Sequence, residues 1–153
     1  MNLSHISDEL LKNEYTSRFG LKTGDTLIQN SQAAVDHLRQ YFIDEPDREL
    51  FVVLFLNGRN QIIATDTLAS GTISTASVFP REIVKAVLKH KSTAVILAHS
   101  HPSGNPEASR DDITITRKLR DALATIDVRI HDHLILSGNR NEFTSMADKG
   151  LLN

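Results

Sequence analysis

Short apolar runs alternate along this chain with longer stretches in which apolar residues recur at helical spacing. Runs of the first kind predict strands, because they are too short for buried helices, lie between turn residues and are rich in β-branched or aromatic side chains. Asn57-Gly58 is a strong hairpin signal between the first two strands. The predicted strands cover 50–56, 61–70, 94–98 and 128–136, with a short last strand at 142–145.

Helical spacing predicts helices in the remaining parts of the chain. Ser31 is the expected N-cap of one of them, and Pro80 suits the first turn of another. The stretch 71–79 is small and polar, so we expect a loop or a short strand there. The predicted helices cover 7–19, 31–45, 80–91 and 109–126.

Strands that alternate with helices, together with one hairpin, predict an α/β domain with a mixed β-sheet flanked by helices. The length of 153 residues fits a single domain with one substantial core. We expect residues 1–30 to form an N-terminal helical arm and residues 31–153 to form the domain. Functional side chains are then expected at the ends of strands.

Composition narrows the range of partners and ligands. The net charge of -2 gives no basic surface of the kind that dedicated nucleic-acid binders carry, so charge does not support a nucleic-acid partner. Cysteine is absent, so any metal must be held by His, Asp or Glu. No apolar run approaches the roughly 18 residues of a membrane helix, and we expect a cytoplasmic protein with no membrane partner.

Two histidines directly follow the predicted strand 94–98. His99 and His101 are two residues apart, so in an extended chain their side chains point to the same side with Cα atoms about 6.6 to 7 Å apart. Imidazoles at this spacing can converge on one zinc ion. Pro102 cannot continue a central strand, so the chain leaves the sheet here and the side chains can reach solvent. We expect a mononuclear zinc site at this strand end.

A third ligand is expected at the start of the next helix, in Ser109-Arg110-Asp111-Asp112. Two histidines and one carboxylate leave a tetrahedral position for water, which is typical of catalytic zinc. The same residues have the form of a capping box between Ser109 and Asp112, and capping competes with ligation by Asp112. Asp111 is a rival for the ligand position, and spacing does not separate the two.

Glu49 and the remaining histidines can each be interpreted as functional residues or as ordinary structural ones. Glu49 precedes the most apolar run and is a candidate general base, although the acidic stretch 44–49 favours an ordinary solvated charge. Alternation along 128–136 places His131 and His133 on one side of a strand, with Asp132 on the other. We expect these residues to line or support the cleft rather than to bind metal. The histidines expected at the surface are His5, His37 and His90.

Taken together, these residues resemble a known motif. His99-Ser-His101, then seven residues, Ser109, two residues and Asp112, with Glu49 upstream, is similar to the JAMM (MPN-plus) metalloprotease motif. A closer resemblance is to the bacterial RadC family, over about residues 31–151. The positions that agree with it are 48–49, 56–57, 71–72, 79–82, 99–106, 109, 112, 132–135 and 150.

The resemblance implies a three-layer α-β-α fold with a mixed β-sheet, a JAMM/MPN domain similar to cytidine deaminases. It implies zinc on His99, His101 and Asp112, which selects Asp112 over Asp111. It also implies Glu49 as the general base and Ser109 as a hydrogen-bond donor to the developing oxyanion. The implied activity is hydrolysis of amide bonds, peptide or isopeptide, in an unknown peptide or protein substrate.

An alternative reading keeps the RadC resemblance without peptidase activity. It is a DNA-repair-associated module, or one that binds nucleic acid or protein, with a non-catalytic or nuclease-type metal site. Full-length RadC proteins carry an N-terminal helix-hairpin-helix region. Fewer than fifty residues precede Glu49 here, so the chain is similar to the short RadC-like form of mobile elements. A deaminase is not expected, because deaminase zinc sites use a Cys pair that this chain lacks.

Overall fold

The sheet defines the architecture of this protein. The computed structural model describes residues 6–27, 31–71, 73, 77–138 and 141–153. In that part of the chain the sheet has five strands in the order β2-β1-β3-β4-β5. Only β3 and β4 pair in parallel, and every other neighbouring pair is antiparallel. The strands are β1 (Glu49–Leu56), β2 (Ile62–Gly71), β3 (Ala94–His101), β4 (Arg129–Ser137) and β5 (Phe143–Ser145).

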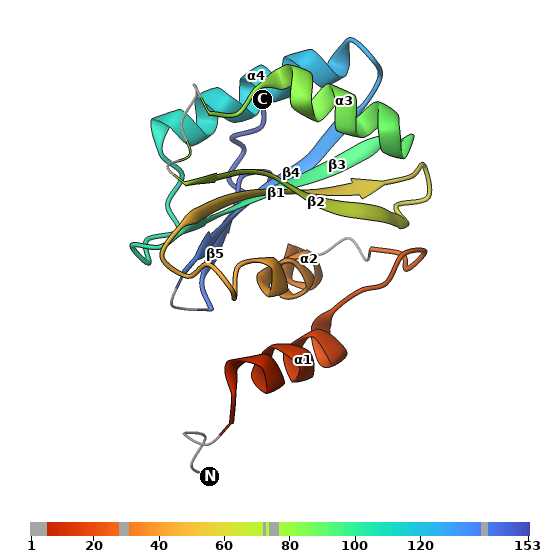
Figure 1. Cartoon of the computed structure of the whole chain (residues 1–153). Coiled ribbons are helices and arrows are strands. Elements are labelled where there is room, and N and C mark those ends of the chain that lie inside the picture. The colour runs from red at the N-terminus through yellow and green to blue at the C-terminus, as the bar shows by residue number, and fades with distance from the viewer. Residues whose placement is uncertain (1–5, 28–30, 72, 74–76, 139–140) are drawn as a thin grey trace.

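Helices cover both faces of this sheet (Figure 1). Helices α3 (Pro80–His90) and α4 (Arg110–Ala124) lie on one face. Helix α2 (Ser31–Leu38), extended by the 3₁₀ turn Arg39–Tyr41, lies on the other, and α1 (Asp8–Phe19) lies beyond α2. The expected three-layer α/β fold with a mixed sheet is therefore confirmed.

Strand β1 explains why its sequence is an unbroken apolar run. Alternate residues face opposite layers: Leu50, Val52, Leu54 and Leu56 belong to the core against α2, and the residues between them belong to the core against α3 and α4. Every side chain from Leu50 to Leu56 is buried. A strand buried on both faces has no polar alternation, which is what the run 50–56 predicts.

Strand β4 departs from the predicted alternation. Its register with β3 shifts between Val95 and Ile96, so that Ile130 pairs with Val95 and Asp132 pairs with Ile96. His131 is the extra residue of a β-bulge, which turns the residues after it to the other face. The prediction that His131 and His133 share one side is therefore wrong. His131 is exposed on the α2 face, and His133 is buried on the α4 face.

Two of the three histidines expected at the surface are at least partly covered. His37 is 2% exposed, because its Nδ1 accepts a hydrogen bond from the backbone N–H of Leu21 at 2.8 Å and the chain before α2 covers the ring. His90 is half-buried and its Nε2 lies 2.6 Å from Asp66 Oδ2. Surface placement is therefore wrong for His37, and His5 lies outside the described residues.

The N-terminal helix α1 lies at the surface. None of its residues is buried, and Tyr15 donates a hydrogen bond to the carbonyl oxygen of Asp36 at 2.7 Å. The division into an arm and a domain at residue 30 stays a prediction. Within the described residues, no helix has both the length and the apolar character needed to cross a membrane.

Candidate metal centre

The end of β3 carries both central histidines. His99 is 1% exposed and His101 is half-buried, and the chain leaves the sheet directly after His101. Gly138 lies against this exit, where a Cβ atom would come within 2.9 Å of the Cα atom of Pro102. His99 pairs in register with Phe51 of β1, and its ring stacks on the Phe51 ring with 6.2 Å between centroids. Neighbouring strands thus hold the first imidazole firmly.

Asp112 lies in the first turn of α4 and is 3% exposed, whereas Asp111 is exposed. Asp112 and Ser109 form the predicted capping box. The backbone N–H of Ser109 donates to Asp112 Oδ2 at 2.7 Å, and the backbone N–H of Asp112 donates to Ser109 Oγ at 3.1 Å. The cap does not turn the carboxylate away from the histidines. The predicted capping box is therefore confirmed, and ligation by Asp112 stays a prediction.

Three side chains converge here into a cluster that can hold a metal ion. His99 Nε2 lies 2.9 Å from Asp112 Oδ1, and His101 Nε2 lies 3.2 Å from Asp112 Oδ2. The two Nε2 atoms are 2.9 Å apart, and one ligand atom from each residue lies within 4.8 Å of the others. The two histidines come from the end of β3 and Asp112 comes from the first turn of α4, so the fold assembles the cluster from two separate elements.

The other ring nitrogens of these histidines are already engaged. His101 Nδ1 lies 2.8 Å from the carbonyl oxygen of Asn105, which can only accept a hydrogen bond. The hydrogen of neutral His101 therefore lies on Nδ1, and its Nε2 carries a lone pair directed at the centre of the cluster. His99 Nδ1 lies 2.8 Å from His133 Nε2. Both imidazoles are thus oriented for ligation through Nε2.

The charges in the cluster favour an ionised carboxylate. Burial raises the pKa of the Asp112 carboxyl, but hydrogen bonds to His101 and His99 outweigh burial and hold that pKa well below its ordinary value. The same hydrogen bond to Asp112 raises the pKa of His101, against the effect of burial. An anionic oxygen ligand is therefore ready between two imidazoles.

Glu49 begins β1 at the same end of the sheet. The antiparallel pairing of Phe51 with His99, extended by two residues, places Glu49 opposite His101, and the charge of Glu49 contributes to raising the pKa of His101. Glu49 is half-buried, and its Oε2 accepts a hydrogen bond from the backbone N–H of Ile73 at 2.5 Å. The structure therefore brings the predicted base to the edge of the cluster.

Ser109 lies on the exposed side of the cluster. Its Oγ accepts the backbone hydrogen bond of the capping box, so the hydroxyl hydrogen is left to donate elsewhere. Ser109 can therefore form the capping box and still serve as the hydrogen-bond donor that the family resemblance implies.

His133 and Thr116 contact the cluster from behind. His133 is fully buried, with Nε2 at 2.8 Å from His99 Nδ1 and Nδ1 at 2.5 Å from Thr116 Oγ1. Burial holds the pKa of His133 well below its ordinary value. Sequence reasoning expected a supporting role for His133 but missed Thr116. The i+4 spacing of Thr116 from Asp112 is the signal that could have pointed to it.

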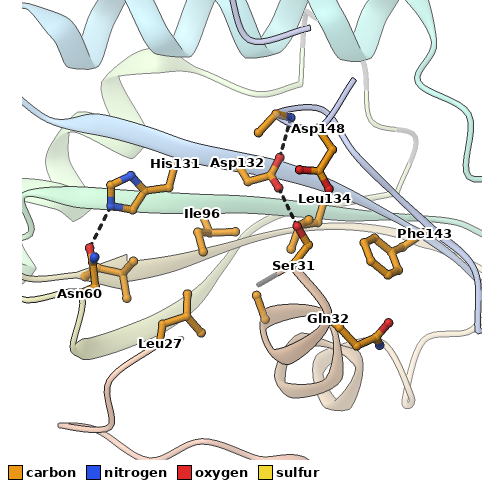
Figure 2. Close-up of a pocket in the computed structure, with 13 residues that line it drawn as sticks. Leu27, Ser31, Gln32, Asn60, Ile96, His131, Asp132, Leu134, Phe143 and Asp148 are labelled. Carbon is orange, nitrogen blue, oxygen red and sulfur yellow. Dashed lines mark hydrogen bonds between the residues drawn. The ribbon is translucent and has the colours of Figure 1, made fainter. Parts of the chain in front are cut away.

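A separate pocket of about 710 Å³ lies on the α2 face of the sheet. Figure 2 shows His131 at one end of it, bonded to Asn60 at 3.0 Å, and Asp132 with Ser31 at the other. Asp132 also accepts hydrogen bonds from Ser145 and from the backbone N–H of Ala147. None of the three clustered side chains lines this pocket, so its volume does not locate the metal cluster.

The family model that matches this chain is that of the RadC-like JAB domain, over residues 28–151. The chain belongs to this family. The match spans β1, β3 and the start of α4, the elements that carry the cluster, and the resemblance to RadC is confirmed.

Curated relatives agree with this assignment. A UPF0758 protein of Cellvibrio japonicus is 45% identical over 132 residues, which cover 86% of this chain and 57% of that protein. A UPF0758 protein of Stenotrophomonas maltophilia is 45% identical over 125 residues, 82% of this chain and 53% of that protein. A third, from Thioalkalivibrio sulfidiphilus, is 50% identical over 104 residues, 68% of this chain and 45% of that protein. The chain spans about half the length of these RadC-family relatives.

Proposed function

We propose that this RadC-like protein is a zinc-dependent hydrolase that cleaves amide bonds in a peptide or protein substrate. The observation that supports the proposal is the convergence of His99, His101 and Asp112 beside Glu49 at one end of the sheet. Two imidazoles and one carboxylate are the donor set of catalytic zinc sites that keep a position open.

The residues fit zinc in two further respects. Both Nδ1 atoms have hydrogen-bond partners, and both Nε2 atoms face the carboxylate of Asp112. The carboxylate is buried and ionised, which offsets the charge of a divalent cation. When bound, zinc would polarise a substrate carbonyl and lower the pKa of a water molecule toward about 7.

Glu49 would act as the general base and then as the general acid. Its carboxylate lies beside the cluster and is oriented by the backbone N–H of Ile73. It would accept a proton from the attacking water and deliver that proton to the amine that leaves. Such transfers by a positioned side chain contribute about 10²- to 10⁴-fold to a rate.

Ser109 would stabilise the negative charge that develops on the carbonyl oxygen. The capping box fixes its Oγ against the backbone of Asp112, and its hydroxyl hydrogen would donate to that oxygen. A donor fixed before the reaction needs no reorganisation when the charge appears.

Zinc content and peptide hydrolysis together test this proposal. Protein loaded with zinc and freed of excess metal is expected to hold one zinc per chain, and His101→Ala is expected to hold much less. On a peptide and isopeptide library, Glu49→Gln is expected to lower the cleavage rate by about 10²- to 10⁴-fold while zinc stays bound. Glu45→Gln is the matched control, four residues earlier in the same acidic stretch, and it should cleave at the wild-type rate.

The alternative binding module predicts a different outcome of the same experiment. A wild-type protein that binds zinc but cleaves no member of the library at a rate above Glu49→Gln would contradict the hydrolase proposal. It would favour a module with a non-catalytic metal site. A wild-type protein that binds no zinc would contradict both the metal and the mechanism.

A further inference from the structure

We propose that His133 and Thr116 are positioning residues for the metal centre, which hold His99 in the tautomer that leaves its Nε2 free to bind a metal ion. This inference rests on the metal binding in the proposed function and extends it to two residues outside the cluster. Neither of them is a member of the group of side chains that can hold the ion.

The geometry places His133 directly behind His99. Strand β4 runs parallel to β3, with Leu97 paired to His133 and His99 paired to Ile135. From this neighbouring strand the His133 ring reaches His99 diagonally, with 4.9 Å between ring centroids and 2.8 Å between Nε2 and His99 Nδ1. The β-bulge at His131 determines which face His133 occupies.

When a metal is bound, His99 must be the donor and His133 the acceptor in the hydrogen bond between their rings. Ligation through His99 Nε2 requires the ring hydrogen on Nδ1, and that hydrogen needs an acceptor. His133 Nε2 can accept it only if His133 carries its own hydrogen on Nδ1. Thr116 Oγ1, at 2.5 Å, is placed to accept from that nitrogen.

Thr116 completes the chain because its hydroxyl hydrogen has an acceptor too. Its Oγ1 lies 2.6 Å from the carbonyl oxygen of Asp112, one helical turn earlier in α4. The three donors on His99, His133 and Thr116 therefore each have an acceptor, and the last acceptor is the carbonyl oxygen of Asp112. The chain joins a ligand on β3 to the backbone of the ligand on α4, so it fixes the two relative to each other.

The surroundings protect these bonds from competition. His133 and Thr116 are both fully buried, and the rings of Phe51 and His133 lie at 75° to each other with 5.6 Å between centroids. Met146 Sδ lies 3.6 Å from Thr116 Oγ1. Buried hydrogen bonds between neutral groups hold a single arrangement more firmly than bonds exposed to water. Partners of this kind typically change metal affinity by about 10- to 100-fold when they are removed.

Zinc affinity of matched variants tests the inference. Competition with a chromogenic chelator is expected to give His133→Leu a Kd about 10- to 100-fold above wild type. His133→Gln keeps an acceptor and a donor on one side chain and is expected to recover most of this loss. His131→Leu is the control, because it makes the same substitution two residues earlier on the exposed side of the bulge, and its Kd should equal that of wild type.

A second pair of variants and an NMR spectrum distinguish a specific effect on the hydrogen bonds from general loss of folding. Thr116→Val keeps the shape of the side chain but removes the hydroxyl, and it should weaken zinc binding, whereas Thr116→Ser should not. Long-range ¹H–¹⁵N spectra of the zinc-loaded wild type should show the hydrogens of His99 and His133 on Nδ1.

The outcomes separate this inference from the proposed function. Wild-type zinc affinity in both His133→Leu and Thr116→Val, or a His99 hydrogen on Nε2 in the zinc-loaded protein, would overturn the inference alone. Absence of zinc binding by the wild type would overturn the proposed function and this inference with it.

Discussion

Replacing one oxygen of Asp112 separates its role in zinc binding from its role in capping α4. Asp112→Asn keeps the size of the side chain and one oxygen that can accept the backbone N–H of Ser109. It removes the charge from the cluster. Asp111→Asn makes the same substitution one residue earlier, on an exposed side chain in the same first turn of α4.

The expected magnitudes follow from these contacts. Without metal, Asp112→Asn should cost about 1 to 2 kcal/mol, because a buried negative charge is lost from a helix N-terminus and from two imidazoles. Asp111→Asn removes a charge from the same helix N-terminus, and its loss of favourable interaction with the helix dipole should cost about 0.3 to 1 kcal/mol. Zinc at about 100 times its Kd should stabilise the wild type and Asp111→Asn by about 2.7 kcal/mol.

Thermal unfolding with and without zinc measures these effects. For a domain of this size, 2.7 kcal/mol corresponds to a rise in Tm of roughly 5 to 11 °C. We expect this rise in the wild type and in Asp111→Asn, and we expect it to be largely absent in Asp112→Asn. A full rise in Asp112→Asn, or its loss in Asp111→Asn alone, would refute the assignment of Asp112 as the third ligand.

Three further predictions concern stability, each measured by urea unfolding. Ser109→Ala should destabilise the metal-free protein by about 0.5 to 2 kcal/mol through loss of the cap, and an unchanged midpoint would contradict the capping role. Leu119→Ala should cost about 2 to 5 kcal/mol, because Leu119 is fully buried between α4 and the sheet, whereas an exposed Leu88→Ala should cost far less. Burial lowers the pKa of His37, so its unfolded state binds a proton first as pH falls below about 6.5. Stability should therefore fall as pH drops below about 6.5, and His37→Gln should reduce this slope by up to about 1.4 kcal/mol per pH unit.

The fold could be predicted from the sequence wherever the residue pattern within one strand or helix shows which of its side chains are buried. The run 50–56 is buried on both faces and therefore carries no polar residue, so its pattern alone shows a central strand. The helix predicted at 80–91 begins at Pro80 and ends at cations, and the structure has it at Pro80–His90. These features depend on local composition and spacing, which the sequence records directly.

Features that depend on contacts between distant segments could not be predicted in this way. His37 is buried because the backbone at Leu21 bonds to its ring, and no local pattern marks that contact. The bulge at His131 adds one residue to β4 against β3, and a strict alternation then misplaces every residue on one side of it. His133 therefore lies on the α4 face, beside His99, while His131 lies on the other.

The candidate site shows the same division between local and distant effects. His99 and His101 follow from a spacing of two at a strand end, whereas the choice between Asp111 and Asp112 does not follow from spacing. On a helix, one residue corresponds to a rotation of about 100°, which turns one carboxylate into the protein and its neighbour into solvent. Burial of Asp112 at 3% exposure decides between them, and that burial depends on where β3 places the histidines.

Capping does not turn Asp112 away from the histidines, because a carboxylate has two oxygens with about four acceptor positions. Asp112 Oδ2 accepts the backbone N–H of Ser109 and faces His101, while Oδ1 faces His99. The cap thereby fixes the side-chain rotamer that points the carboxylate at both imidazoles. The capping box, which the sequence offers as an alternative to metal binding by Asp112, is thus what orients Asp112 as the proposed ligand. The first turn of α4 therefore also positions the carboxylate that we propose as the third ligand.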